Sequence, residues 1–431
     1  MSKKIKDTII IGFALFAMFF GAGNLLLPPY IGLQIGENIA VTILAFGLTG
    51  ILLPFFGILA VVQSGNSIED LGKRIHPLLA PILGSVIMLC IGPMIAIPRT
   101  GATTFEVGIL PIFPNFNPII ASVLFFTTTW LLTISPSKVV DIIGSYLTPL
   151  LLVLLVLLVT VGIVFPLAPA TDKGLAAAPS FSLGFTEGYQ TLDVLASVIF
   201  AGIIIASVNS KGYQSLKEKN SVVIKAGILS ASSLFIIYGG LIYLGATTDI
   251  KDSSISRSSL LIHIAQSNLG VYGMYAIAVS IALACLTTAI ALTSAVGIFF
   301  SRLTNNRLSY KFLVTICCII SGVLSISGVD KIIQFAYPPL VLVYPIVITL
   351  VLYLVIFGKS IKSRAPYIGA LIGSGIVAVL TFFNQLNFFE ESTLETLHKI
   401  PLFEMDLAWI IPSIIGFIIG LLISPKKPAA I

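Results

Sequence analysis

Charged side chains are scarce in this chain. Only 10% of its 431 residues are Asp, Glu, Lys or Arg, whereas 57% are hydrophobic, and the mean hydropathy is +1.07. A soluble domain carries about a quarter charged residues, so these side chains are too few to cover a surface that faces water. The composition therefore argues against any soluble domain and indicates a protein of the lipid bilayer.

Patterns typical of other protein classes are also missing. Short segments of alternating hydrophobicity, which would indicate a membrane β-barrel, do not occur. The three histidines lie in loops or at the ends of apolar segments, without an H-E-x-x-H or similar motif: His76, His263 and His398. The four cysteines lie inside apolar segments, with the spacing of neither a disulfide framework nor a metal site: Cys90, Cys285, Cys317 and Cys318. We therefore expect a protein that is not an enzyme.

Apolar segments recur along the whole chain, each long enough to cross about 30 Å of hydrocarbon as a helix. We expect twelve of them, at residues 8–30, 39–63, 78–108, 117–135, 144–166, 190–207, 222–246, 272–300, 312–328, 331–357, 366–384 and 407–424. The first follows three lysines but has no A-x-A cleavage site, so we expect a membrane helix and not a signal peptide. The sequence predicts an all-α integral membrane protein of a single transmembrane domain, with its longest loops at 166–189, 247–271 and 383–406.

The positive charges predict the orientation of these segments. If the N-terminus lies in the cytoplasm and the loops alternate, 18 of the 24 lysines and arginines fall on the cytoplasmic side. This excess follows the positive-inside rule, so we expect a multi-pass protein of the bacterial cell (inner) membrane with both termini cytoplasmic. The net charge of +6 is then a topology signal. We expect contact with membrane lipid and no nucleic-acid partner.

The first apolar segment contains an interruption near the middle of the membrane. Residues 20–24 read Phe-Gly-Ala-Gly-Asn, and a glycine costs about 1 kcal/mol inside a helix. Phe20 lies about 18 Å along a helix that starts at Thr8, where lipid offers no partner to released backbone groups. The alternative is a packing motif of small residues, which we also expect at Gly369 and Gly373.

The sixth segment shows a weaker departure from a plain helix. It is short, with Gly202 at mid-depth and Asp193 near one end, and we expect its broken stretch at Leu195 and Ala196. The first and sixth segments begin two five-segment halves. Interrupted helices in corresponding positions of two halves indicate the binding site of a transporter, and the halves would be inverted repeats.

The eighth segment carries two adjacent hydroxyl groups, on Thr287 and Thr288. Thr287 lies about 22 Å along this segment, again near the middle of the membrane. Oxygen is the ligand that a hard cation prefers. The alternative is that each hydroxyl bonds back to a carbonyl of its own helix.

Two motifs resemble a known family. Residues 20–25 (Phe-Gly-Ala-Gly-Asn-Leu) with Pro28-Pro29, and residues 91–100 (Ile-Gly-Pro-Met-Ile-Ala-Ile-Pro-Arg-Thr) with Phe105-Glu106, resemble those of the branched-chain amino acid:cation symporters, the BrnQ-type (LIVCS) carriers. The resemblance runs over essentially the whole chain. It implies import of Leu, Ile and Val coupled to Na+, with H+ as the alternative ion. The sequence shows no sign of an obligate protein partner.

The resemblance also implies a LeuT-like fold of two inverted five-helix repeats, at 8–166 and 190–357, followed by two additional helices at 366–424. In that fold one sodium lies between the first and eighth helices, held by backbone carbonyls and two hydroxyls. The matching positions are Ala17, Phe20, Ala284, Thr287 and Thr288. A second sodium site of some relatives needs an Asn matched by Asn24, and an amide on the seventh helix, where this chain has only Ser230, Ser232 and Ser233.

We expect the substrate at the two breaks. The amides of Ala22 and Gly23, at a helix N-terminus, favour a carboxylate, and carbonyls around the breaks favour an ammonium, so no charged side chain is needed. The apolar side chain of the substrate would contact Phe19, Phe200 and Ala201, together with Ile95 or Ile97. The predicted substrate-binding set is Phe19, Gly21, Ala22, Gly23, Asn24, Leu195, Ala196, Phe200, Ala201 and Gly202.

Three charged residues are candidate gates on the outer side: Arg99, Glu106 and Asp193. Arg99 is alternatively an anchor whose side chain snorkels to the interface. A channel would line a continuous polar path, and no segment has a repeated polar stripe. A carrier of the same fold for another small neutral amino acid, or one driven by protons, remains the alternative function.

Overall fold

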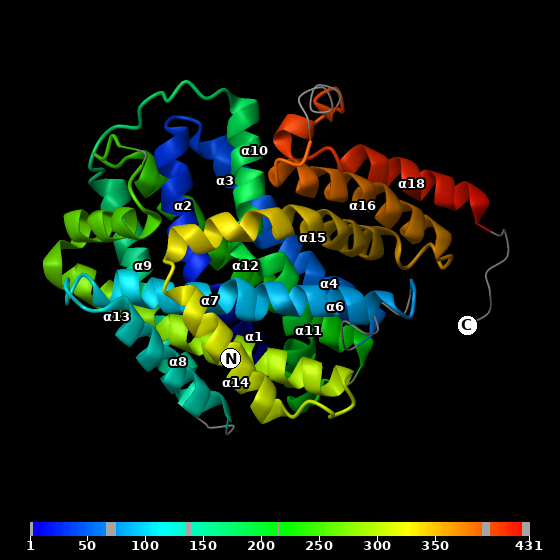
Figure 1. Cartoon of the computed structure of the whole chain (residues 1–431), viewed down its shortest axis with the longest axis horizontal. Coiled ribbons are helices and arrows are strands. Elements are labelled where there is room, and N and C mark those ends of the chain that lie inside the picture. The colour runs from blue at the N-terminus through cyan, green and yellow to red at the C-terminus, as the bar shows by residue number, and fades with distance from the viewer. Residues whose placement is uncertain are drawn as a thin grey trace.

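Every regular element in the described part of the chain is a helix. The computed structural model describes residues 3–65, 75–134, 139–213, 215–252, 254–389 and 397–424. Figure 1 shows a helix bundle in which α2, α3 and α10 lie close together, while α16 and α18 run side by side along one edge.

Among the described residues, the first half of the chain forms ten α-helices. They are α1 (Lys3–Phe19), α2 (Ala22–Ile35), α3 (Ile39–Gly47), α4 (Leu53–Ser64), α6 (Leu79–Leu89), α7 (Ala96–Thr103), α8 (Pro118–Ile134), α9 (Val139–Val164), α10 (Ala177–Glu187) and α11 (Asp193–Ser210). Three π-helical turns, η1 (Leu48–Leu52), η2 (Cys90–Met94) and η3 (Thr104–Ile109), extend these helices, and the 3-10 turn η4 (Gly188–Thr191) precedes α11.

In the second half, the described helices are fewer and mostly longer. They are α12 (Leu216–Ala246), α13 (Arg257–Leu303), α14 (Tyr310–Ser325), α15 (Val329–Phe357), α16 (Ala365–Gln385) and α18 (Ile410–Ile423), with the short turn η5 (Phe403–Met405) before the last.

The predicted apolar segments are found as helices. Among the described residues, seven helical stretches are long and apolar enough to cross a membrane, and the bent pair of α1 and α2 makes an eighth. Four shorter apolar helices, in α8, α9, α14 and α18, match the remaining segments. Large apolar side chains on α18 are 40% to 51% exposed, as expected where a helix faces lipid: Ile411, Ile414, Ile415, Ile418 and Ile419. The predicted all-α membrane class is confirmed.

The predicted interruption of the first segment is confirmed. α1 ends at Phe19 and α2 begins at Ala22, and the two axes differ by 69°. Gly21, the residue before α2, has an extended backbone with φ −112° and ψ −172°. The break therefore turns the two half-helices away from one axis and leaves their ends facing the interior of the bundle.

Two stretches predicted as loops contain helices, so those predictions are wrong. Residues 166–189 include α10 and the start of η4, and residues 247–271 include the start of α13 up to a kink at Gly270, where φ is 69°. Neither stretch has about twenty consecutive apolar residues, so a search for membrane-length segments passes over them. Part of the third long loop, residues 390–396, lies outside the described residues.

Candidate functional site

A cavity lies at the break between α1 and α2. Its volume is about 40 Å³, and it is lined by Met18, Phe19, Gly21, Ala22, Gly23, Asn24, Ile91, Ala96, Arg99, Thr100, Thr191, Leu192, Asp193, Ala196, Phe200, Thr288 and Leu292. A lining that is largely apolar with a few polar groups is usual for a small-molecule site, although a bound amino acid would require this cavity to widen. The first, third, sixth and eighth predicted segments all contribute to it.

The amino end of α2 opens onto this cavity. Gly21, Ala22 and Gly23 line it, and the first backbone amides of a helix have no partner within the helix. These amides carry the positive end of the helix dipole. The Asn24 side chain accepts a hydrogen bond at 3.4 Å from the Gly21 amide, which also donates to the Phe19 carbonyl. The local geometry suits an anionic group of a ligand.

Asn24 also joins three helices through a buried polar network. Its Nδ2 donates to Asp193 Oδ2 at 2.6 Å and to the hydroxyl of Tyr238. These side chains come from α2, α11 and α12 and are 1% to 3% exposed. A buried polar network of this kind specifies how the helices pack, because each unmet group would be costly. Asn24 therefore positions α2 as well as lining the cavity.

The turn η2 directs Arg99 into the cavity. Pro93 has no amide hydrogen, and it disfavours a helical conformation for Gly92, which has φ −91° and ψ −123°. The helix restarts at Ala96 as α7, and Arg99 lies one turn later. Its side chain is 3% exposed and its Nη1 donates to the carbonyl of Gln190 at 2.7 Å. Arg99 does not snorkel to an interface, so that prediction is wrong.

The second break lies earlier in the chain than predicted. Leu192 adopts a left-handed backbone with φ 66°, and α11 then runs without interruption from Asp193. The expected broken stretch at Leu195 and Ala196 is therefore wrong, because both residues lie in the first turn of a continuous helix. The residues at the actual break, Thr191 and Leu192, line the cavity.

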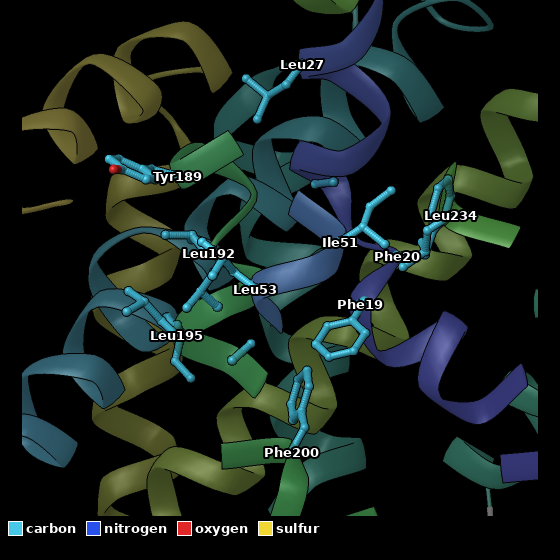
Figure 2. Close-up of a cluster of buried hydrophobic side chains, with 14 of the residues drawn as sticks. Phe19, Phe20, Leu27, Ile51, Leu53, Tyr189, Leu192, Leu195, Phe200 and Leu234 are labelled. Atoms are coloured by element: carbon cyan, nitrogen blue, oxygen red, sulfur yellow. The ribbon is translucent and has the colours of Figure 1, made fainter. Parts of the chain in front are cut away.

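Part of the predicted apolar pocket lines the cavity. Phe19, Ala196 and Phe200 do so, and the rings of Phe19 and Phe200 face one another with centroids 6.2 Å apart (Figure 2). Leu195, Ala201 and Gly202, also predicted, are not among the lining residues. From the third segment, Ile91 and Ala96 line the cavity in place of Ile95 and Ile97, because the η2 turn rotates the helix between them.

Three of the five predicted sodium ligands lie together on α13. The hydroxyls of Thr287 and Thr288 both donate to the Ala284 carbonyl, at 2.8 and 3.0 Å. This is the back-bonding that hydroxyls ordinarily make in helices. Because each hydroxyl gives its hydrogen to that carbonyl, the lone pairs of its oxygen remain available, whereas a cation would compete for the Ala284 oxygen.

The other two predicted ligands lie at the carboxyl end of α1. The amides of Phe20 and Gly21 donate to the carbonyls of Phe16 and Phe19, so neither reaches the Ala17 carbonyl. The Phe20 carbonyl lies in the gap between α1 and α2. Thr288 approaches this gap, since its methyl group would lie 3.9 Å from a Cβ placed on Gly21. The five residues are thus divided between α13 and the end of α1 with the gap that follows it, and their carbonyl and hydroxyl oxygens suit a hard cation.

A second sodium site has little support at Asn24. The amide nitrogen of this side chain is engaged with Asp193 and Tyr238, and its oxygen accepts from the Gly21 amide. On α12, Ser233 bonds back to Leu229, and the buried hydroxyl of Ser230 has no partner among the described residues.

Glu106 lies outside the cavity. It accepts from the Ser258 hydroxyl at 2.5 Å and from the Val329 amide at 2.9 Å. Ser258 and Val329 lie in the first turns of α13 and α15, so the carboxylate caps the N-terminus of α15 through a backbone amide and bonds a side chain at that of α13, where negative charge is favourable. Of the three candidate gates, Arg99 and Asp193 line the cavity and Glu106 joins helix ends elsewhere.

Comparison with known proteins gives a family and a fold. The family described as "Branched-chain amino acid transport protein" matches residues 4–427. The branched-chain amino acid permease BraB of Bacillus subtilis (strain 168) is 36% identical over 438 residues, covering 99% of this chain and 98% of its own. The permease BrnQ of the same organism is 34% identical over 437 residues, covering 98% of each chain.

Solved transporters share the fold at low sequence identity. Mhp1, a nucleobase-cation-symport-1 family transporter in a closed conformation with bromovinylhydantoin bound, matches with a TM-score of 0.61 at 12% identity, over 96% of this chain and 92% of its own. A Na+-coupled sialic acid symporter in a substrate-bound outward-open state matches at 0.58 and 14% identity, over 98% and 91%. These similarities concern the fold alone, and they confirm the LeuT-like fold that the family resemblance implied.

Proposed function

The chain belongs to the branched-chain amino acid transport protein family and is a branched-chain amino acid carrier, and on that premise we propose that it imports Leu, Ile and Val together with Na+ as a secondary active symporter. The observation that carries this proposal is the cavity at the break between α1 and α2, which joins a helix N-terminus to an apolar pocket.

The amino end of α2 supports binding of the α-carboxylate. The free amides at Ala22 and Gly23 and the dipole of α2 favour a negative group there. The apolar part of the cavity supports the substrate class, because Phe19, Phe200 and Ile91 line it. A hydrophobic pocket separates substrates by only about 1–3 kcal/mol per methylene, so Leu, Ile and Val are all expected to bind.

The oxygen atoms near the same break support sodium as the coupling ion. The Ala17 and Phe20 carbonyls and the Thr287 and Thr288 hydroxyls are uncharged oxygen ligands, and Thr288 approaches the gap after α1. A cation held between α1 and α13 would stabilise the arrangement of the break that binds the substrate. Binding of each ligand then strengthens binding of the other by the same factor.

Alternating access follows from two inverted halves that move around the fixed cavity. We assign the first half to residues 8–166 and start the second at α10 (Ala177–Glu187), earlier than the expected residue 190, because α10 and α11 flank the second break. The residues 366–424 form the additional helices. The distribution of Lys and Arg supports cytoplasmic termini.

Uptake by purified protein in liposomes tests this function. An inward sodium gradient should drive accumulation of labelled leucine, and unlabelled isoleucine and valine should compete while lysine and glutamate should not. Strong competition by lysine would contradict the apolar pocket. Uptake that follows a pH gradient and ignores sodium would assign the proton as the coupling ion, and failure of all three branched-chain substrates would favour a carrier of another small neutral amino acid.

A further inference from the structure

Two opposite charges line the substrate cavity without pairing with one another. Arg99 on α7 and Asp193 at the start of α11 both line the cavity, and each is 3% exposed. No direct ion pair joins these two described residues. Buried charges are ordinarily paired, because an unpaired one carries a large desolvation cost. This cavity therefore presents a separated cation and anion to whatever fills it.

The guanidinium of Arg99 has unused hydrogen-bonding capacity. A guanidinium carries five N–H donors, and its hydrogen bond to the protein goes to the neutral carbonyl of Gln190. Its Nε is buried and has no partner among the described residues. A buried cation with only a neutral acceptor leaves a place for an anionic oxygen pair, which a guanidinium binds in a two-pronged geometry.

The guanidinium also lies against the amino end of α2. A Cβ added at Gly23 would lie 2.5 Å from Arg99 Nη2, 2.8 Å from Cζ and 3.1 Å from Nη1. The absence of a side chain at Gly23 is what admits the guanidinium. A cation beside the positive end of a helix dipole is electrostatically unfavourable unless an anion sits between them. The unused donors of Arg99 and the positive end of the α2 dipole both favour a carboxylate beside Gly23.

Asp193 offers the opposite charge, beside Asn24 at the same end of α2. Its Oδ2 accepts from Asn24 Nδ2 at 2.6 Å, which orients the carboxylate. Asn24 is neutral, so it orients this carboxylate without neutralising it, and Arg99 acts on it without a direct contact. A primary ammonium has three donors and matches a carboxylate in a buried site.

We propose that Arg99 binds the α-carboxylate of the transported amino acid and that Asp193 binds its α-ammonium. This assignment rests on the proposed function, in which the cavity takes a zwitterionic amino acid, and it replaces a gating role for these two residues with a recognition role. The pair selects molecules that carry both a carboxylate and an ammonium. Amines and hydroxy acids of the same shape lack one of the two contacts.

The experiment measures the binding of three ligands to the wild type and to variants of Arg99 and Asp193. Leucine, leucinamide (which lacks the carboxylate) and 2-hydroxy-4-methylpentanoate (which lacks the ammonium) are compared by competition against labelled leucine. Ligand-induced shifts of the unfolding midpoint extend the comparison to variants that no longer bind labelled leucine. The wild type should prefer leucine to each analogue by about 10- to 100-fold, the usual effect of a hydrogen bond to a charged group.

Arg99→Gln should remove the preference for leucine over leucinamide and keep the preference over the hydroxy acid. Asp193→Asn, which preserves an acceptor for Asn24, should show the reverse pattern. Arg257→Gln is the matched control: this arginine pairs with Asp330 at 2.7 Å and lines a different pocket, so both preferences should remain.

Equal weakening of all three ligands by Arg99→Gln would overturn the proposal and make Arg99 structural. If that variant does not fold, Arg99→Lys keeps the charge but loses the two-pronged geometry, and an unchanged preference over leucinamide would equally overturn it. A wild type that does not bind leucine contradicts the proposed function itself. A wild type that binds leucine with unchanged preferences in both variants contradicts only the recognition pair.

Discussion

The most specific predictions about ion coupling concern single residues near the break between α1 and α2. Changing both Thr287 and Thr288 to Ala removes two oxygens that neighbouring apolar side chains cannot replace. We expect the sodium concentration for half-maximal leucine uptake to rise by about 10- to 100-fold, with partial recovery at high sodium because the coupling is reciprocal. Both Thr→Ser changes keep the oxygen and should have mild effects.

An unchanged sodium dependence in the double-alanine variant would contradict the role of Thr287 and Thr288 as ion ligands. If the folded double-alanine variant keeps the sodium dependence of the wild type, the two hydroxyls serve only the helix, through their bonds to the Ala284 carbonyl. The coupling ion then binds elsewhere.

Phe200 is the residue expected to set the size of the apolar pocket. Its ring faces Phe19 across the cavity and is 3% exposed. Phe200→Ala should weaken leucine binding by about tenfold or more and should reduce the penalty for larger side chains such as that of phenylalanine. Phe312→Ala, at a ring that is 52% exposed on α14, is the control. Equal effects of the two changes on leucine competition would refute the assignment of Phe200 to the pocket.

At the scale of elements, some breaks can be predicted from sequence and others cannot. The first break is marked by Gly21 and Gly23, which weaken the helix on their own. The second is at Leu192, whose left-handed backbone has φ 66°. Leucine rarely adopts this conformation, so only tertiary packing imposes it and no local signal reveals it. Because packing leaves no local signal in the sequence, Thr191 and Ile91 were not predicted as site residues. For the same reason the break was predicted at Leu195 and Ala196, which is too late in the chain.

The close contact between helices α16 and α18 predicts which glycine of α16 cannot accept a side chain. A Cβ on Gly369 would collide with the backbone of Gly416, so the two helices meet backbone to backbone, as small residues allow. Gly369→Leu should destabilise the protein by about 1–3 kcal/mol through overpacking. Leucine affinity should not change, because neither helix lines the cavity.

Gly375→Leu is the matched control for that change. It lies on the same helix, and a Cβ there meets nothing within 4 Å, so the unfolding midpoint should stay near that of the wild type. Equal losses of thermal stability in both variants would mean that α16 is sensitive to any leucine, and the close contact would not be the cause.

At the scale of the whole molecule, the charge distribution predicts which ends of the helices face the cytoplasm. Single cysteines at the exposed positions Lys217 and Lys362 should react with a membrane-impermeant reagent only after permeabilisation, whereas one at Asp252 should react in intact cells. The native cysteines are buried, so their background should be low. Labelling of position 362 from outside would contradict the orientation.

The binding of leucine at increasing sodium, at constant ionic strength, tests most directly whether substrate and ion share the break between α1 and α2. We expect the leucine affinity of the purified protein to rise with sodium to a plateau. We also expect Gly23→Ala to lower it, since a Cβ there would collide with the Arg99 guanidinium. Equal leucine affinity in sodium and in choline, together with an unchanged affinity in Gly23→Ala, would contradict a shared site.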